Sequence, residues 1–194
     1  MRELLIATRN PGKVAEIKAA LQGLPLTFVS LEDTDAGDVE ETGATLVENA
    51  VLKARVYGDW TGKLAIADDS GLEVDALNGA PGVASARYAK SDSARIDKLL
   101  RELASVPEAR RTAKFRSVIA IHDPAIGKTA VAEGSAEGHI LSARRGEQGF
   151  GYDPIFLYDE ARKSGGEMSR EEKNAVSHRG KALAKARELL KQYI

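Results

Sequence analysis

The sequence predicts an α/β protein with a long mixed β-sheet flanked by helices, arranged as two lobes around a central active-site cleft. Strand-like and helix-like segments alternate in the first part of the chain, and strand-like segments dominate its middle. Apolar residues make up 43% of the chain, which is enough for a proper core. Because we find no linker, internal repeat or low-complexity tract, we predict a single domain over residues 1–194.

The first part of the chain is assigned from its apolar spacing and its turn residues. Short apolar runs predict strands, and apolar residues three or four apart predict helices. Thr45 is a suitable helix cap, and Gly62 follows the last residue with helical spacing. The predicted elements are a strand at 4–7, a helix with Val14, Ile17 and Leu21 on one face, a strand at 26–33, an acidic loop at 33–44, a helix at 45–62 and a buried strand at 63–71.

The second part is read in the same way. Alternating apolar and polar residues predict half-buried strands, and Gly/Pro-rich stretches predict loops. The predicted elements are a strand from 72 that becomes a loop before 88, a helix at 92–106, an antiparallel strand pair at 112–123 and 129–141, a Gly-rich segment leading into a strand at 149–159, and a polar turn followed by an amphipathic helix within 169–194.

Composition excludes several classes of protein. The 28 Lys and Arg residues nearly balance the 29 Asp and Glu residues, which argues against a general nucleic-acid binder. No apolar run reaches the roughly 18 residues of a membrane span, and no secretion signal is recognised, so we expect a cytoplasmic protein without a membrane partner. The chain has no cysteine, which excludes disulfides and thiolate metal sites.

The segment "TRNPGK" lies where the first strand ends and the first helix begins. Thr8, Asn10, Lys13 and the helix N-terminus could converge there on an anion. The segment is not a G-x-x-x-x-G-K-[ST] loop, because it has one glycine and no Ser or Thr after the lysine. The alternative is an ordinary turn with a solvated lysine.

A carboxylate pair, Asp68-Asp69, follows the apolar run "LAIA". We expect it where a buried strand meets a loop, which is a frequent position for catalytic groups. Carboxylates there can hold Mg²⁺ and accept a proton from water. Because adjacent strand residues point to opposite faces, we expect only Asp69 to enter the cleft. The alternative is a turn in which the Asp side chains cap backbone amides.

Asn49 and Lys53 are four residues apart, so they share one face of the predicted helix at 45–62. The plain expectation for such a pair, taken by itself, is that it is solvated. A glutamate from the preceding acidic loop could add a metal ligand near this helix, although nothing in the local sequence requires it.

Two segments of the second part suit the flat ring and polar edges of a base. In "GFGYDP" an aromatic ring is presented between glycines beside a carboxylate, which suits stacking on a flat ring and accepting its N–H groups. In "KNAVSHR" five polar side chains that can donate hydrogen bonds lie just before a helix, where they could bind phosphate and base edges. The alternative for the first segment is a turn with aromatic side chains in the core. The alternative for the second is a helix-capping turn with exposed basic side chains.

Taken together, these segments offer cations, carboxylates for a metal, an aromatic ring and hydrogen-bond donors, which is the set that a nucleoside polyphosphate requires. They also carry a resemblance. The stretches "TRNPGK", "EETGATLVENAVLKA", "ADDSGLEVDALNGAPGVASARY", "AEGSAEGHI", "GFGYDPIF" and "MSREEKNAVSHRGKAL" extend from residue 8 to residue 183. In them the chain resembles the inosine triphosphate pyrophosphatase family, which removes non-standard purine nucleotides such as ITP, dITP and XTP.

The resemblance implies a Mg²⁺-dependent homodimeric hydrolase that cuts between the α- and β-phosphates, releases the nucleoside monophosphate and pyrophosphate, and so keeps deaminated purines out of DNA and RNA. It also implies a role for each matching residue. These are Thr8, Asn10, Lys13, Lys53 and Lys173 at the triphosphate; Glu41 and Asp69 at the metal; Asp69, Lys53 and Asp68 in catalysis; Phe150 stacked on the base; Asp153, Ser177, His178 and Arg179 around the base edge; and Ser70, Gly151 and Tyr152 as further substrate contacts.

Two other classes of function were weighed. A nucleotide-binding regulator without catalysis could use the same residues, but a binder of a polyanion gains little from unneutralised carboxylates. A nucleic-acid module could use the basic final helix, but Leu183, Ala186, Leu189 and Leu190 give that helix an apolar face and make its lysines a solvated side.

Overall fold

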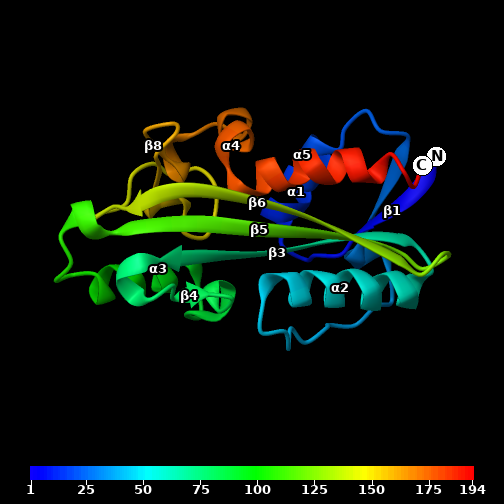
Figure 1. Ribbon diagram of the computed structural model, residues 1–194, viewed down its shortest axis with the longest axis horizontal. Coiled ribbons are helices and arrows are strands. Elements are labelled where there is room, and N and C mark those ends of the chain that lie inside the picture. Colours follow the sequence, from blue (N-terminus) through cyan, green and yellow to red (C-terminus); the bar gives the residue numbers. More distant parts are fainter. The chain divides into compact units, whose positions relative to one another are not determined.

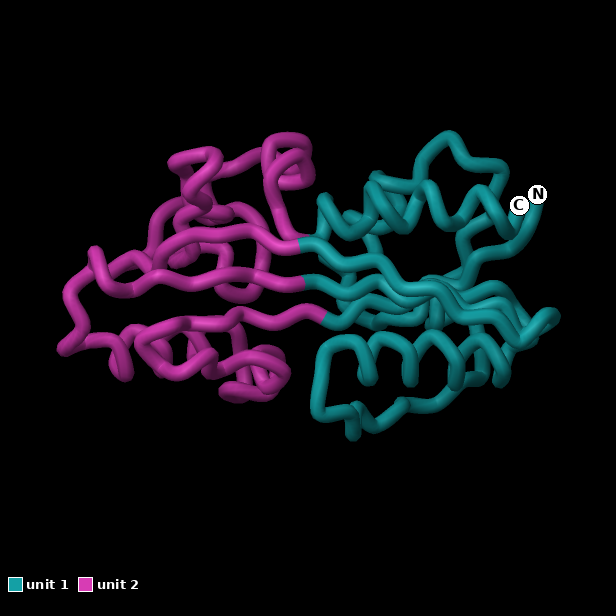
Figure 2. The backbone as a smooth tube through the Cα atoms, in the orientation of Figure 1, with its two compact units in different colours: residues 1–69, 117–134, 179–194 teal, residues 70–116, 135–178 magenta.

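The computed structural model describes all residues, 1–194, and the chain forms two compact units (Figure 2). Unit 1 comprises Met1–Asp69, Ser117–Gly134 and Arg179–Ile194, and unit 2 comprises Ser70–Arg116 and Ser135–His178. Three strands, β3 (Leu64–Val74), β5 (Thr112–Asp123) and β6 (Lys128–Ile140), contribute residues to both units. The hydrogen-bonded strand order is β2-β1-β3-β5-β6-β7-β8, with β4 paired to β3.

Unit 1 is a sheet with helices on both faces. Strand β1 pairs in parallel with β2 and with β3, and Leu4 lies opposite Phe28 on one side and Leu64 on the other. Helices α1 and α5 cover one face of this part of the sheet, and α2 covers the other (Figure 1). The elements that lie in unit 1, wholly or in large part, are β1 (Arg2–Ile6), α1 (Pro11–Ala20), β2 (Leu26–Ser30), α2 (Leu46–Thr61) and α5 (His178–Leu190).

Local sequence explains where the helices of unit 1 begin and end. Pro11 occupies the first turn of α1, where its missing N–H costs nothing, and the Asn10 side chain accepts a hydrogen bond from the backbone N–H of Lys13. Helix α2 begins with a reciprocal capping box between Thr45 and Glu48 and ends at Gly62, whose φ of 68° suits glycine. The predicted cap and terminator of this helix are confirmed.

The core of unit 1 is formed by apolar residues of β1, β3 and β5 packed against α1 and α5. Leu4, Ile6, Ile17 and Ile66 are fully buried in it. The predicted apolar face of the last helix is confirmed, since Leu183, Ala186 and Leu190 are buried and Leu189 packs against the same cluster.

Unit 2 has its own core and two short edge strands. Strand β7 pairs antiparallel with β6 and with β8. The rings of Phe115, Phe156 and Tyr158 pack in sequence, with ring centroids 4.6 and 4.8 Å apart. The elements that lie wholly in unit 2 are β4 (Pro81–Gly82), α3 (Asp92–Glu102), β7 (Phe156–Tyr158), β8 (Lys163–Ser164) and α4 (Arg170–Val176).

The mixed sheet flanked by helices confirms the predicted fold class, and several element boundaries are corrected. The second strand ends at Ser30, because the Ser30 and Asp33 side chains cap a short 3-10 turn over Leu31–Asp33. Helix α3 ends at Glu102 instead of continuing to 106, and Arg170–Val176, at the start of the segment 169–194 where the sequence predicts a polar turn, forms the capped helix α4. No helix is long and apolar enough to cross a membrane.

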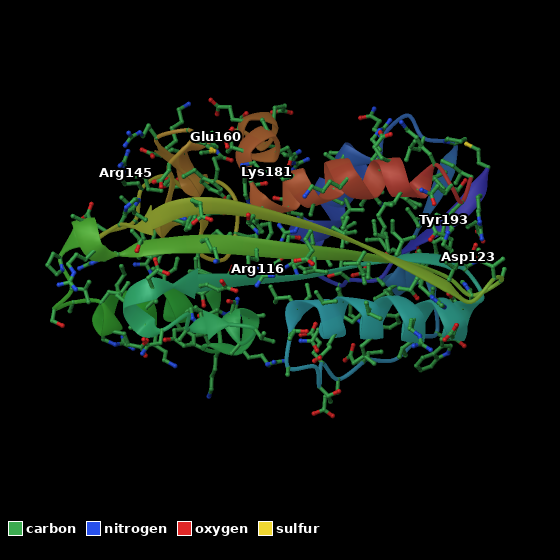
Figure 3. The ribbon with its side chains drawn as sticks, viewed as in Figure 1. Arg116, Asp123, Arg145, Glu160, Lys181 and Tyr193 are labelled. Carbon is green, nitrogen blue, oxygen red and sulfur yellow. The ribbon has the colours of Figure 1, made fainter.

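The two chain ends of unit 1 are joined by Arg2. Its guanidinium donates to the backbone oxygen of Tyr193 at 2.6 Å and forms an ion pair with the buried carboxylate of Asp123 at 2.7 Å. Figure 3 labels Asp123 and Tyr193 near this end of the unit. The arrangement fixes the end of the chain after α5 against the end of β5.

Replacing Ile66 by alanine should lower the free energy of unfolding by about 2–5 kcal/mol, because it leaves a cavity in the core of unit 1. Urea unfolding followed by circular dichroism measures this loss. The matched control is Ile126→Ala, since Ile126 is 65% exposed between β5 and β6. A similar loss in both variants would contradict the assignment of the core.

Candidate functional site

The carboxylates of Asp68 and Asp69 lie inside strand β3, which continues to Val74, so the prediction that they stand at a strand end is wrong. Ser70 and Gly71 belong to the same strand. Both carboxylates are buried, at 0% and 6% exposure. Since neighbouring strand residues point to opposite faces, the two side chains have different partners.

Asp68 is surrounded by donors from α1, α5 and β5. Its Oδ2 is 2.5 Å from Lys13 Nζ, and its Oδ1 is 3.3 Å from Arg179 Nε and accepts a hydrogen bond of 2.6 Å from the Ser117 hydroxyl. Burial by itself would raise the pKa of Asp68, but the charges of Arg179 and Lys13 hold this pKa well below its usual value. Asp68 is therefore an anchor that is ionised at neutral pH.

Arg179 has a second carboxylate partner, Glu16 of α1, at 2.5 Å from its Nη1. With Lys13 and Asp68 these residues form a buried network of two positive and two negative charges, which satisfies each charge that burial has removed from water. Sequence reasoning missed Glu16 and Ser117. The one signal for Glu16 is its position three residues after Lys13, which places both on the same helix face.

Asp69 faces a different cation. Its Oδ1 is 3.4 Å from Lys53 Nζ, whereas its Oδ2 is buried and has no hydrogen-bond partner. Burial raises the pKa of Asp69, and the nearby carboxylates of Glu41 and Asp68 act in the same direction against Lys53 and Lys13. A buried carboxylate oxygen without a partner is costly, so this atom points to a ligand that the site is built to receive.

Lys53 lies between Glu41 and Asp69, the two carboxylates that the resemblance places at a metal. Its ammonium lies 2.6 Å from Glu41 Oε1 and donates to the backbone oxygen of Asp68 at 2.8 Å. The expectation that Asn49 and Lys53 are solvated is wrong, because Asn49 is 0% exposed and Lys53 is 9% exposed. Burial opposes the charge of Lys53, but Asp69 and Glu41 raise its pKa above the usual value.

The residues around Asp69 fit a divalent cation in part. Asp69 Oδ2 supplies an oxygen without a partner, and Glu41 supplies a second, half-buried carboxylate next to the same lysine. No group of three or more His, Asp or Glu side chains is close enough to hold a metal by itself. This donor set suits Mg²⁺, which commonly takes one or two carboxylates and completes its shell with water and substrate phosphates.

Two residues of the opening loop shape its backbone. The hydroxyl of Thr8 accepts a hydrogen bond of 3.2 Å from the N–H of Asn10, and Asn10 Oδ1 accepts one of 3.0 Å from the N–H of Lys13. The loop thus leads from β1 into α1 with the N–H of Lys13, in the first turn of the helix, already capped. Of the predicted phosphate contacts in unit 1, the structure brings Lys13 and Lys53 to the carboxylate pair.

In unit 2, Asp153 organises the aromatic segment. Its Oδ2 accepts a hydrogen bond of 2.8 Å from the N–H of Phe150 and lies 2.6 Å from Lys173 Nζ. Lys173 Nζ in turn lies 4.6 Å from the centroid of the Phe150 ring, a cation–π contact. Phe150 is half-buried, so the ring is held from one side while part of it stays accessible.

The loop around Phe150 is fixed on both sides. A Cβ at Gly149, whose φ is +77°, would lie 2.1 Å from Asp153 Oδ2, so this position requires glycine. The N–H of Gly151 donates to Asp92 Oδ2 at 2.8 Å, and the hydroxyl of Tyr152 donates to the backbone oxygen of Ser85 at 3.0 Å. Tyr152 is part of the core of unit 2, so this hydrogen bond is structural.

The remaining predicted substrate residues of unit 2 are Ser70, Ser177 and His178. Ser70 is half-buried and follows Asp69 directly in β3. Ser177 and His178 are buried at the junction of α4 and α5, and the His178 ring stacks on Phe115 with centroids 4.5 Å apart. Arg179, the next residue, belongs to unit 1, where Asp68 and Glu16 hold it.

The predicted site residues therefore fall into two groups, one in each unit. The group in unit 1 contains cations and carboxylates, and the group in unit 2 contains an aromatic ring with its supporting charges. A comparison with known protein families decides what this chain is related to, because the Ham1 family matches residues 4–189. The chain belongs to the Ham1 family.

Relatives of this Ham1 chain are similar over their whole length. The dITP/XTP pyrophosphatase of Geobacter sulfurreducens is 52% identical over 198 residues, which cover 100% of this chain and 97% of that protein. The dITP/XTP pyrophosphatase of Desulforamulus reducens is 51% identical over 192 residues, which cover 97% and 95%. The resemblance recognised in the sequence is thereby confirmed.

Solved structures of Ham1 proteins share the fold of this chain. The Ham1 protein of Coxiella burnetii superposes with a TM-score of 0.90 at 41% identity, covering 99% of this chain and 100% of that structure. The Ham1 protein of Staphylococcus aureus gives a TM-score of 0.87 at 40% identity, with full coverage of both chains.

Replacing Asp68 by asparagine should lower the free energy of unfolding by about 3–5 kcal/mol at pH 7, because it leaves buried cations without their partner. The folded-state pKa of Asp68 is below its unfolded value, so its stabilisation is present above the ordinary carboxyl pKa of about 4 and is lost as the pH falls through the folded-state pKa. The difference between the wild type and Asp68→Asn should therefore shrink in acid.

Urea unfolding between pH 7 and pH 3, without nucleotide or metal, measures this difference. Asp35→Asn is the control, because Asp35 is an exposed carboxylate of the same unit. A difference for Asp68→Asn that stays constant over this range would show that Asp68 is not held ionised by Lys13 and Arg179.

Proposed function

We propose that this protein is a Mg²⁺-dependent pyrophosphatase that hydrolyses non-standard purine nucleoside triphosphates (ITP, dITP and XTP) to the nucleoside monophosphate and pyrophosphate. The observation that carries the proposal is the Asp69 carboxylate, which has one oxygen beside Lys53 and the other buried without a partner. The dITP/XTP pyrophosphatases that are about half identical to this chain support the choice of substrate.

The chemical step requires a water molecule in line with the leaving pyrophosphate. Its oxygen bonds to the α-phosphorus, the bond from that phosphorus to the bridging oxygen breaks, and the electron pair leaves with pyrophosphate. The Asp69 carboxylate takes the proton of the water. A raised pKa suits this task, because a base works best when its pKa approaches the working pH, and such catalysis contributes roughly 10²–10⁴-fold.

Charge on the triphosphate is met by the lysines of unit 1. Lys13 and Lys53 are already held by Asp68, Asp69 and Glu41, so little reorganisation is needed when negative charge develops. Glu41 and Asp69 would hold Mg²⁺, which supplies Lewis-acid charge neutralisation when bound. Thr8 and Asn10 shape the loop that carries Lys13 and offer it further polar contacts.

The base is assigned to the group in unit 2. Phe150 supplies the stacking face, and Asp153 and Lys173 hold that ring in place from the other side. A hydrogen-bond donor directed at O6 of hypoxanthine or xanthine would face the amino group of adenine instead, and a polar site can reject such a mismatch by roughly 10⁴-fold. Ser177 and His178 are our candidates for this donor, with Ser70, Gly151 and Tyr152 as neighbouring contacts.

Arg179 is better explained as a support of Asp68 than as a reader of the base. Its guanidinium is 3% exposed and is paired with Asp68 and Glu16. We further propose that the chain acts as one two-lobed domain in a cytoplasmic homodimer, which equilibrium sedimentation of the purified protein and fractionation of cells would test.

A product assay tests the proposed function. The purified protein with Mg²⁺ should release pyrophosphate rapidly from ITP, XTP and dITP, and far more slowly from ATP and GTP. Orthophosphate as the direct product would exclude the α–β cleavage, and equal rates on all five nucleotides would exclude our account of the base site. The control is Asp69→Asn, which should abolish release while leaving nucleotide binding largely intact.

Asp159→Asn serves as the matched variant, because Asp159 is an exposed carboxylate whose Oδ1 lies 2.8 Å from His139 Nδ1. Release by Asp159→Asn should equal that of the wild type. Retained turnover in Asp69→Asn would remove Asp69 from the chemical step without affecting the identity of the products.

Replacing Phe150 by alanine should weaken binding of inosine monophosphate by about 1–3 kcal/mol, the usual contribution of a base stacked on an aromatic ring. Isothermal titration calorimetry measures the change. Trp60→Ala is the control, because Trp60 is 52% exposed and lies in α2 of unit 1. An unchanged affinity in Phe150→Ala would place the base elsewhere.

A further inference from the structure

The segment that carries Glu41 has no helix or strand of its own. Between the 3-10 turn that ends at Asp33 and helix α2, which begins at Leu46, the backbone has no regular structure. Four acidic residues lie within seven positions of this segment, at 35, 38, 40 and 41, and their like charges repel one another. The placement of Glu41 must therefore come from contacts with other elements.

Helix α2 holds the C-terminal side of this segment. The N–H of Gly43 donates to the buried Asn49 Oδ1 at 2.7 Å, and the N–H of Val39 donates to the hydroxyl of Tyr57 at 3.2 Å. A Cβ at Gly43 would lie 2.6 Å from Asn49 Oδ1, so the close approach requires glycine. Together with the Lys53–Glu41 ion pair, these contacts attach the segment to one face of α2.

The N-terminal side is held by Arg9, which belongs to a different element. Arg9 Nη2 donates to the backbone oxygen of Ala36 at 2.7 Å, and Arg9 Nε lies 3.0 Å from Asp38 Oδ1. Ala36 is 4% exposed, so its oxygen has little access to water and depends on this donor. Asp38 is 91% exposed, and an exposed ion pair alone is weak, so the contact with Ala36 carries more of the attachment.

Arg9 is also part of the opening loop, between Thr8 and Asn10. The same loop continues into α1 and Lys13, whose ammonium pairs with Asp68. One side chain thus connects the backbone that precedes Lys13 with the backbone that precedes Glu41. This connection lies wholly within unit 1.

We propose that Arg9 is a positioning residue that holds the segment 34–44 against the opening loop and so fixes Glu41 for metal binding; the metal half of this inference rests on the proposed function. Groups behind a metal ligand set its orientation, and their loss commonly reduces metal affinity by about 10- to 100-fold. The planar guanidinium is suited to this role because it reaches two acceptors with a fixed geometry, which a lysine ammonium does not match.

Hydrogen exchange of the protein without metal and nucleotide tests the attachment. In Arg9→Gln, the amides of segment 34–44 should exchange about tenfold faster than in the wild type, because local opening becomes easier. Arg55→Gln is the matched control, since Arg55 is an exposed arginine on α2, and its exchange pattern should equal that of the wild type. Arg9→Lys should fall between Arg9→Gln and the wild type. Unchanged exchange in Arg9→Gln would overturn the proposal.

The Mg²⁺ concentration that gives half-maximal pyrophosphate release tests the link to Glu41. It should rise about tenfold in Arg9→Gln, while the rate at saturating Mg²⁺ and the preference for ITP over ATP stay as in the wild type. In a Glu41→Gln background, Arg9→Gln should cause no further rise, because the ligand that Arg9 positions is gone. An unchanged midpoint, or an equal rise in both backgrounds, would overturn the link.

The two proposals fail in different ways. If the wild type releases no pyrophosphate, the proposed function is wrong and the metal link falls with it, while hydrogen exchange still decides whether Arg9 holds the segment. If the wild type is active and the variants differ from it in neither measurement, the proposed function stands and the role of Arg9 is excluded.

Discussion

The buried charge of Asp68 is the constraint on which the rest of unit 1 depends. A fully buried carboxylate is tolerated only when cations and hydrogen-bond donors replace the water it has lost. Lys13 comes from α1, Arg179 from α5 and Ser117 from β5, so three segments far apart in the sequence must meet at this side chain. The position of both helices on one face of the sheet is therefore linked to a single carboxylate (Figure 1).

The strand that carries Asp68 also explains why the two adjacent carboxylates behave differently. Neighbouring side chains of β3 point to opposite faces of the sheet. Asp68 therefore meets the cations Lys13 and Arg179 and the Ser117 hydroxyl. Asp69 meets Lys53 and lies near the carboxylate of Glu41. The pKa of the first falls and the pKa of the second rises. Environments that separate the pKa values of a pair are the usual sign that one group is an anchor and the other takes part in proton transfer.

Most cations of the candidate site are already paired with carboxylates of the protein. Lys53 lies beside Glu41 and Asp69, and Lys173 lies beside Asp153. Under the proposed function, a triphosphate bound at Lys53 would have to share this lysine with Glu41 and Asp69, which favours a substrate that brings its own counter-charge as a metal complex. Asp153 Oδ2 lies beside Lys173 Nζ and accepts a hydrogen bond from the backbone N–H of Phe150, so this oxygen holds the aromatic segment.

The sequence by itself determined the fold class, the helix caps and the family, because apolar spacing, Thr45, Gly62 and the motifs are local properties of the chain. It also identified the residue types of the site. Only the tertiary structure decided which of them are neighbours: it placed Asp68 and Asp69 inside a strand, buried Asn49 and Lys53, and added Glu16, Ser117 and Arg9. Glu16 and its partner Arg179 are 163 residues apart along the chain. Nothing in local spacing encodes which distant charge a buried carboxylate will meet.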